Sequence, residues 1–344
     1  MSTYSFLDDY SEGCHPAIVE ALARTNLTQQ TAYGDDEYSL RARTLIREQL
    51  GDANLPIHFV ASGTVANLII IASALRPHEA VIAAVSGHIA MRETGAIEAT
   101  GHKVITMPST DGKLTPVAVE SAVADNAQAP HMAKPRLVYI SNATEFGTVY
   151  TRTELTGLRA VCDAHRLLLL VDGARLGAAL SAPRADVSLS DLVSLADAFW
   201  IGGTKAGALI GEAIVLPNAA IAEDFAYAVK QRGALLAKGR LLGLQFQTLF
   251  EDGLYFKLAA HANAMAQKLS HGIVRAGHSL AAQTQSNQVF PVLPNALIER
   301  LREQFAFYTW SESGDARAVI RLVTSWATDE ARVDAFVDLV NEAG

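Results

Sequence analysis

The 344-residue sequence lacks the features that mark several large protein classes. Cysteine is almost absent, and Cys14 and Cys162 form no Cys-x-x-Cys pair, which argues against a disulfide framework or a cysteine-based zinc site. No apolar run approaches the roughly 18–20 residues that cross a bilayer. The first residues also lack a basic segment followed by an apolar one, so no signal peptide is expected. We therefore expect a cytoplasmic protein that does not bind a membrane.

Charged residues are scarce as well, at 19% of the chain, and the net charge is −8 without a long basic run. Such a chain is not expected to bind nucleic acid or an anionic membrane surface. The sequence has no His-Glu-x-x-His, no Gly-x-Ser-x-Gly and no Gly-x-Gly-x-x-Gly after a strand, and we expect no metal site. What is present is apolar sequence, 50% of the residues, which can bury a large core.

Short apolar segments alternate with amphipathic ones through most of the chain. Strands are expected at 57–61, 80–84, 103–107, 137–141, 167–171, 198–201 and 213–216. Helices are expected at 16–23, 38–50, 65–75, 88–100, 116–124 and 155–165, and residues 224–275 are predicted to be helical throughout. This alternation predicts an α/β fold with a mostly parallel sheet and helices on both faces.

The last part of the chain has a different pattern. Strands at 288–293, 305–308 and 319–323, followed by a helix at 330–340, predict a smaller α+β domain. We therefore divide the chain into an N-terminal arm (1–15), a large α/β domain (16–250) and a small C-terminal domain (251–344).

A carboxylate and a lysine each follow one of the predicted strands. Asp172 comes directly after the apolar run 167–171, and Lys205 follows Gly202-Gly203-Thr204. Because ligands bind outside the carboxyl ends of such strands, the two are expected to converge. A pyridoxal phosphate enzyme needs a lysine for its Schiff base and a carboxylate beside the pyridinium nitrogen. Each residue has an ordinary alternative: Asp-Gly favours a turn, and the lysine suits an exposed loop, though not a P-loop, since Ala206 follows it.

Four further positions carry polar groups in suitable places. Ser62-Gly63-Thr64 begins a predicted helix, where backbone N–H groups can bind phosphate. Arg175 follows the strand-end aspartate and can pair with a carboxylate. His88 begins another predicted helix and can stack on a ring or move a proton, although a lone histidine is also a common cap or core residue. Arg321 lies in an apolar strand and needs an anion, either a substrate carboxylate or an acidic residue of the fold.

In this order along the chain, these residues resemble the threonine aldolase group of fold-type I pyridoxal phosphate enzymes, in the β-eliminating lyase superfamily. The resemblance implies an aspartate aminotransferase-like large domain with a mostly parallel central sheet, and a smaller α+β domain. It also implies a homotetramer, a dimer of dimers with shared active sites. The matching strings are Asp8-Asp9-Tyr10-Ser11, Tyr33-Gly34-Asp35-Asp36, Ser62-Gly63-Thr64-Val65-Ala66-Asn67, Gly87-His88, Asp111-Gly112-Lys113-Leu114, Asp172-Gly173-Ala174-Arg175, Gly202-Gly203-Thr204-Lys205 and Arg321-Leu322-Val323-Thr324-Ser325-Trp326.

The resemblance implies a role for each site residue. Lys205 would form the Schiff base with the cofactor, and Asp172 would pair with the pyridinium nitrogen. Arg175 would contact a cofactor oxygen and the substrate carboxylate, with Arg321 as the second carboxylate ligand. His88 would stack on the cofactor ring, and Tyr33 and Glu145 would bind the substrate. Lys230 would reach the phosphate in a neighbouring subunit, and Tyr33 would also act in a neighbouring subunit. The phosphate would be bound by Ser62, Gly63, Thr64 and Thr204.

The implied reaction is retro-aldol cleavage of L-threonine, L-allo-threonine and related β-hydroxy-α-amino acids to glycine and an aldehyde. Either His88, acting through water, or Glu145 would take the β-hydroxyl proton, and the sequence does not decide between them. Two positions depart from the family: Leu7 stands where many members have a carboxylate-binding serine, and Glu145 where many have a second histidine. The alternatives are β-elimination or transamination of another amino acid, and a binding protein that keeps the fold without the cofactor.

Overall fold

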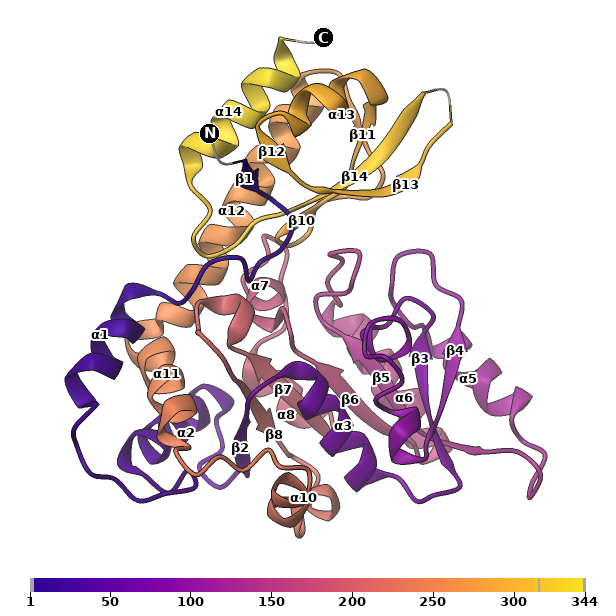
Figure 1. The fold of residues 1–344 in the computed structure, drawn as a ribbon. Helices are drawn as coiled ribbons and strands as arrows, with labels where there is room; N and C mark the ends of the chain where they lie inside the picture. The colour runs from indigo at the N-terminus through magenta and orange to yellow at the C-terminus, as the bar shows by residue number, and fades with distance from the viewer. Residues whose placement is uncertain (1–2, 315, 343–344) are drawn as a thin grey trace.

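A seven-stranded sheet forms the centre of the computed structural model, which describes residues 3–314 and 316–342 (Figure 1). In sheet order the strands are β2 (Ile57–Val60), β8 (Glu212–Val215), β7 (Ala198–Gly202), β6 (Leu168–Asp172), β5 (Lys134–Ser141), β3 (Glu79–Ala84) and β4 (Lys103–Met107). The strand β8 is antiparallel to its two neighbours, and all other neighbouring strands are parallel. The predicted α/β fold with a mostly parallel sheet is confirmed.

The two faces of this sheet pack into separate apolar cores. On β6, Leu169 and Val171 belong to one core, Leu168 and Leu170 to the other, and all are buried, as expected of a central parallel strand. The helices of the first core include α1 (Pro16–Thr25), α2 (Glu37–Leu50), α5 (Pro116–Asp125), α6 (Arg152–His165), α8 (Leu189–Leu195) and α11 (Arg240–Phe250). The second core includes α3 (Gly63–Ala74), α9 (Ala219–Ala222) and α10 (Phe225–Gln231). None of the helices in the described ranges is long and apolar enough to cross a membrane.

A second, antiparallel sheet lies above the first in the view of Figure 1. Its order is β10 (Gln288–Val289), β14 (Arg317–Val323), β11 (Pro291–Pro294) and β9 (Ser279–Leu280), with β13 (Tyr308–Glu312) also paired to β14. The helices that share its core are α12 (Leu254–Arg275), α13 (Asn295–Arg302) and α14 (Glu330–Asn341). The predicted C-terminal α+β unit is thus confirmed.

The beginning of the chain is attached to this C-terminal unit. The strand β1 (Tyr4–Ser5) pairs in parallel with β12 (Phe305–Ala306). Phe6 is 0% exposed and its ring stacks on Phe305. From there the chain runs to α1 beside the large sheet, so residues 7–15 link the two units (Figure 1). The limits predicted for the arm and the two domains stay a prediction, since α12 itself extends from one unit into the other.

The helix predicted at 88–100 is wrong, because the chain turns inside it. α4 (His88–Met91) is only one turn long, and a separate 3₁₀ turn, η1 (Glu98–Thr100), follows it. Between them Thr94 and Gly95 have φ angles of 52° and 71°, in the left-handed region that ends a helix. The break allows Glu93 to lie back against the start of α4.

Other elements differ in continuity. The helix predicted throughout 224–275 is divided into α10, α11 and α12, with Gly233 at φ 72° in the first gap and Asp252 and Gly253 at 54° and 66° in the second. The strand predicted at 288–293 divides into β10 and β11, and that at 305–308 into β12 and β13. Four α-helices of the described ranges were not predicted: α7 (Leu176–Leu180), α8, α9 and α13. The remaining predicted elements are confirmed, apart from a few residues at their ends.

Candidate active site

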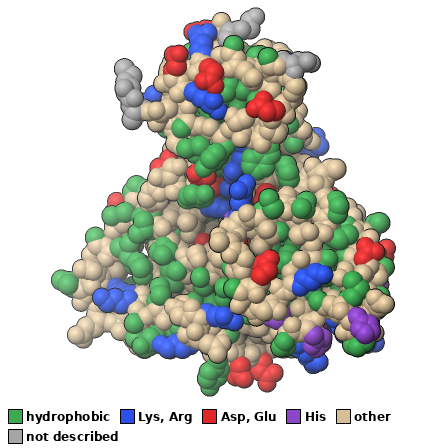
Figure 2. Space-filling model, turned by 45° about the vertical axis from the view of Figure 1, so that its right-hand side comes forward, with side chains coloured by type: hydrophobic (Ala, Val, Ile, Leu, Met, Phe, Trp, Pro, Cys, Tyr) green, Lys and Arg blue, Asp and Glu red, His purple; other side chains and the backbone are tan. Residues whose placement is uncertain are grey.

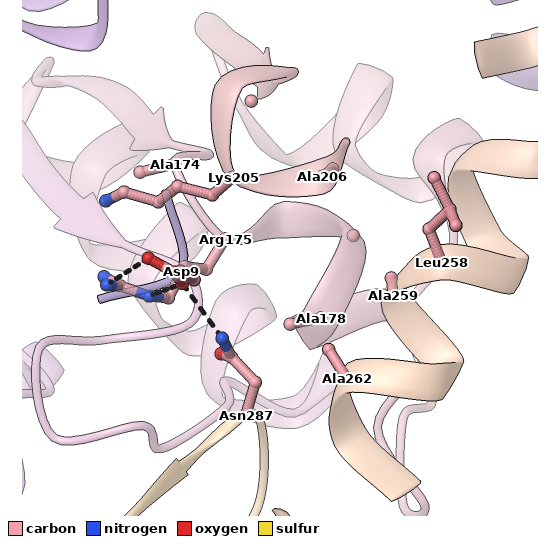
Figure 3. Close-up of a pocket in the computed structure, with 12 residues that line it drawn as sticks. Asp9, Ala174, Arg175, Ala178, Lys205, Ala206, Leu258, Ala259, Ala262 and Asn287 are labelled. Carbon is pink, nitrogen blue, oxygen red and sulfur yellow. Dashed lines mark hydrogen bonds and ion pairs between the residues drawn. The ribbon is translucent and has the colours of Figure 1, made fainter. Parts of the chain in front are cut away.

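The site lies at the carboxyl ends of β6 and β7, where the two units meet. Asp172 ends β6, and Lys205 is on the 3₁₀ turn η2 (Thr204–Ala206) just after β7. Figure 2 shows basic and acidic side chains in the hollow between the upper and lower parts of the molecule. A pocket there is lined by Lys205 and Arg175 from the large sheet, and by Asp9 and Asn287 from segments far away in sequence (Figure 3).

Asp172 is 3% exposed and accepts hydrogen bonds on both carboxylate oxygens. Its Oδ2 accepts from Asn67 Nδ2 at 2.9 Å and from the Tyr139 hydroxyl at 2.6 Å. Its Oδ1 accepts from the Ala174 N–H at 2.9 Å, which is the ordinary contact of an Asp-Gly turn. Three donors stabilise the ionised form of a buried carboxylate. The turn alternative and the functional prediction are therefore both compatible with the observed geometry.

A hydrogen-bonded chain connects this aspartate to His88. Asn67 donates from Nδ2 to Glu93 Oε1 at 2.8 Å as well as to Asp172, and its Oδ1 accepts from Trp200 Nε1 at 3.0 Å. The same Glu93 oxygen lies 2.8 Å from His88 Nδ1. Because an ionised carboxylate only accepts, the Nδ1 of His88 donates to Glu93, and Nε2 is the ring nitrogen left to face a ligand. The His88 side chain is 38% exposed and can present that nitrogen to a ligand.

Glu145 contacts His88 from another side. Its Oε1 accepts from the His88 backbone N–H at 3.0 Å and from Ser141 Oγ at 2.7 Å. Burial raises the pKa of Glu145, and the charge of Asp172 acts in the same direction. Among the described residues, the buried Oε2 atoms of Glu145 and Glu93 have no hydrogen-bond partner.

Arg175 is bound by Asp9 along one edge of its guanidinium. Nε donates to Asp9 Oδ2 at 2.7 Å and Nη2 to Oδ1 at 3.1 Å, and Asn287 Nδ2 also donates to Oδ2 at 2.9 Å (Figure 3). Burial opposes both charges, yet the pair raises the pKa of Arg175 and lowers that of Asp9. Within residues 3–314 and 316–342, Nη1 has no partner and is the group left for a ligand. The departure predicted at Leu7 stays a prediction.

Lys205 lines the pocket with Asp9 and Arg175, and so the exposed-loop alternative is wrong. Burial lowers the pKa of the Lys205 ammonium, and the neighbouring Arg175 charge lowers it further. The carboxylates of Asp9, Asp172 and Glu212 act in the opposite direction. A buried lysine with a depressed pKa is the usual nucleophile for a carbonyl group.

The start of α3 has the arrangement expected of a phosphate site. Ser62 caps the helix, with its Oγ accepting from the Val65 N–H at 3.4 Å. In the described part of the chain no hydrogen bond uses the N–H of Gly63 or Thr64, as is normal for a first helical turn. A Cβ at Gly63 would lie 2.6 Å from Trp200 Cη2, so only glycine allows this close approach of α3 to β7.

The Thr204 side chain forms hydrogen bonds with its neighbours on β8 and the preceding loop. Its hydroxyl donates to Glu212 Oε1 at 2.8 Å and accepts from the Gly211 N–H at 3.2 Å. The hydroxyl hydrogen is therefore donated within the protein, and the predicted role of Thr204 at the phosphate stays a prediction.

Arg321 lies on β14 and faces the site from the C-terminal unit. Its Nε donates to Gln288 Oε1 at 3.1 Å, and its guanidinium lies 5.5 Å from the Trp310 ring centroid. No acidic residue of the described chain forms an ion pair with it, so the alternative of an acidic partner in the fold is not met. Burial lowers the pKa of this guanidinium, and the nearby Arg175 charge has the same effect.

Tyr33 and Lys230 lie together but apart from the pocket that contains Lys205. The Lys230 ammonium is 4.6 Å from the Tyr33 ring centroid, and both line a shallow surface hollow with Tyr227. Tyr33 is 46% exposed and Tyr227 76% exposed. Within one chain these residues do not complete the site, and their predicted role in a neighbouring subunit stays a prediction.

Sequence reasoning missed six residues that support the site. Asn67 and Tyr139 could have been suspected, because each is a polar side chain inside an apolar helix or strand and needs a buried partner. Glu93 depends on a chain reversal, Glu212 on the pairing of neighbouring strands, and Asp9 and Asn287 on contacts between distant segments, none of which a local sequence pattern reveals. The six residues are Asp9, Asn67, Glu93, Tyr139, Glu212 and Asn287.

Comparison with known proteins shows the family of the chain. Residues 6–296 match the model of the Beta-eliminating lyase family. The chain is 37% identical to the low specificity L-threonine aldolase of a Pseudomonas species, over 95% of this chain and 93% of that protein. It is 36% identical to the low specificity L-threonine aldolase of Pseudomonas aeruginosa, over 96% and 95% of the two chains.

Solved structures give the same result. The threonine aldolase of Leishmania major is 48% identical and superposes with a TM-score of 0.97, covering 99% of each chain. An aspartate aminotransferase of Thermus thermophilus shares the fold alone, with a TM-score of 0.73 at 15% identity, over 99% of this chain and 92% of that one. The fold is the aspartate aminotransferase-like fold type I of pyridoxal phosphate-dependent enzymes. By its sequence and its fold, the chain belongs to the beta-eliminating lyase family.

Proposed function

We propose that this chain is a pyridoxal phosphate-dependent aldolase that cleaves L-threonine, L-allo-threonine and related β-hydroxy-α-amino acids to glycine and an aldehyde. The names of its Pseudomonas and Leishmania relatives support this reaction. The observation that carries the proposal is the combination, in one site, of the buried, hydrogen-bonded carboxylate of Asp172 with Lys205, whose cationic form is destabilised.

The residues of the site fit pyridoxal phosphate. Asp172 would hold the protonated ring nitrogen, and Lys205 would bond to the aldehyde carbon. The unbonded N–H groups of Gly63 and Thr64, with the Ser62 hydroxyl, would bind the phosphate at the start of α3. When bound, the cofactor supplies an electron sink for cleavage of the Cα–Cβ bond of an amino acid.

Two arginines would bind the substrate carboxylate. Arg321 is a partly buried cation without an acidic partner among the described residues, and Nη1 of Arg175 is open as well. Two cations close together repel each other, which destabilises the charged form of each. A substrate carboxylate between them would offset this repulsion. We also propose that Arg175 reaches the cofactor oxygen through the same Nη1, since Asp9 occupies its other edge.

Of the two candidate bases, the geometry favours His88. Its Nδ1 is directed at Glu93, so Nε2 is the proton acceptor, and its ring would stack on the cofactor. Burial raises the pKa of Glu145, which lowers the fraction of its side chain that is ionised and able to accept a proton. In addition, Oε1 of Glu145 already accepts two hydrogen bonds. We propose that His88 takes the β-hydroxyl proton, directly or through water, and that Glu145 contacts the substrate through Oε2.

The assembly and location follow from the same proposal. A homotetramer, as a dimer of dimers, would cover the exposed Tyr33, Tyr227 and Lys230 and bring Tyr33 and Lys230 to a neighbouring active site. We propose a cytoplasmic enzyme with an amino acid substrate.

A panel of β-hydroxy-α-amino acids, with both diastereomers of each, tests the proposal. Equal amounts of glycine and aldehyde are expected from L-threonine and L-allo-threonine. Lys205→Ala should reduce this cleavage to background, since the lysine that holds the cofactor is lost. Pyruvate with ammonia would instead indicate β-elimination, and a requirement for a keto acid would indicate transamination.

A further inference from the structure

Glu212 is a buried carboxylic acid that the proposed reaction does not use. It begins β8 and is 5% exposed. Its Oε2 accepts from the Gly203 N–H at 2.9 Å, and its Oε1 accepts from the Thr204 hydroxyl at 2.8 Å. These are the two groups that immediately precede Lys205, so one side chain fixes the turn on which the lysine stands.

The contacts of Glu212 suit an ionised carboxylate. Both oxygens accept hydrogen bonds, and no hydrogen bond in the described residues has Glu212 as a donor. Burial of a charge is costly unless a counter-charge lies close by. No lysine, arginine or histidine of the described chain forms an ion pair with Glu212, and the cation that acts on it is Lys205.

The influence between the two groups is mutual. Burial raises the pKa of Glu212 to about 7, and the Lys205 charge lowers it. In the same way, the Glu212 charge raises the pKa of Lys205 against the effects of burial and Arg175. Asp172 and Asp9 also act on Lys205, but each already has its own set of donors on other segments. Glu212 differs because its donors belong to the lysine's own turn.

We propose that Glu212 is a positioning residue for Lys205, which fixes the Gly203–Thr204 turn and holds a negative charge that stabilises the cationic form of the lysine nitrogen. The inference rests on the proposed function, because the cofactor on Lys205 provides its readout. It also gives the Thr204 hydroxyl a function, since its hydrogen is donated to Glu212.

The test is a pH titration of the visible absorbance of the holoenzyme, which reports the proton on the lysine nitrogen bound to the cofactor. Glu212→Gln keeps the size of the side chain and removes its charge. Its titration midpoint is expected about half a pH unit or more below that of the wild type, because a stabilising anion is lost. Glu79→Gln is the matched control: Glu79 is 6% exposed, begins β3 and accepts from the Arg76 N–H, so its substitution should leave the midpoint unchanged.

A second pair of variants keeps the carboxylate in place. Thr204→Val removes the hydroxyl donor, which destabilises the anion on Glu212, and the midpoint should again move to lower pH. Thr204→Ser keeps the donor and should titrate like the wild type. This pair decides the matter if Glu212→Gln does not fold.

The outcomes separate the two proposals. A midpoint equal to the wild-type value in folded, cofactor-loaded Glu212→Gln, or equal values in the two Thr204 variants, would overturn the role of Glu212. A fall in melting temperature without a change in midpoint has the same meaning, since a purely structural role predicts it. If Lys205→Ala showed the same pH-dependent absorbance as the wild type, the assignment of the cofactor to Lys205 would fail instead.

Discussion

The Asn67 side chain links both the Asp172 carboxylate and the Glu93–His88 pair, and we predict that its removal destabilises the fold measurably. The side chain is 0% exposed and makes three hydrogen bonds, to Glu93, to Asp172 and from the Trp200 indole. Bonds to ionised acceptors contribute about 1.5–3 kcal/mol each and a neutral one about 1 kcal/mol. Asn67→Ala should therefore lower the free energy of unfolding by about 4 kcal/mol or more.

The assay is urea unfolding of the wild type and the variant at the same protein concentration, followed by circular dichroism. Asn263→Ala is a matched control, because Asn263 is 3% exposed but makes one side-chain hydrogen bond, from Nδ2 to the Ala178 carbonyl. Its loss should be about 1 kcal/mol. Equal losses in the two variants, or a loss below about 1 kcal/mol for Asn67→Ala, would refute the view that Asn67 joins the Asp172 and His88 sides of the site.

Three further predictions concern the charged groups. Glu93→Ala should lower kcat about 100-fold or more, because His88 loses the acceptor that fixes its ring, while Glu93→Gln keeps an acceptor oxygen and should restore most of the rate. Asp9→Asn should raise KM for the amino acid about tenfold, which corresponds to about 1.4 kcal/mol, since Arg175 loses its bidentate partner; an unchanged KM would contradict this. Because the pKa of Glu212 rises on folding from 4.5 to about 7, the native state binds this proton more tightly than the unfolded chain does. The stability of the wild type relative to Glu212→Gln should therefore fall between pH 4.5 and about 7, by at most about 3 kcal/mol, and a difference independent of pH in urea titrations would disprove it.

The sequence predicted the sheet and the strand-end residues well because both depend on local pattern. The buried run that ends at Asp172 and the Gly-rich turn before Lys205 are recognisable without any tertiary contact. The confirmed strands β6 and β7 are neighbours in the sheet, and both residues lie at their carboxyl ends. The positions of the principal catalytic candidates thus follow from periodicity and topology.

The supporting contacts could not be predicted for a different reason. The helix predicted at 88–100 ignored the reversal at Thr94, and the reversal is what brings Glu93 to His88. The pairing of Asp9 with Arg175 requires the N-terminal segment to be attached to the C-terminal unit through β1 and β12. Such long-range pairing leaves no periodic signal in either segment, and so the sequence could not show that Asp9 is the partner of Arg175.

The central claim is that Lys205 holds the cofactor. The most direct measurement is borohydride reduction of the pyridoxal phosphate-loaded protein, followed by proteolysis and mass spectrometry of the labelled peptide. We predict a single modified lysine, Lys205, in the wild type and no stable label in Lys205→Ala. A label on another lysine, such as Lys230, or equal labelling of the variant would contradict the account.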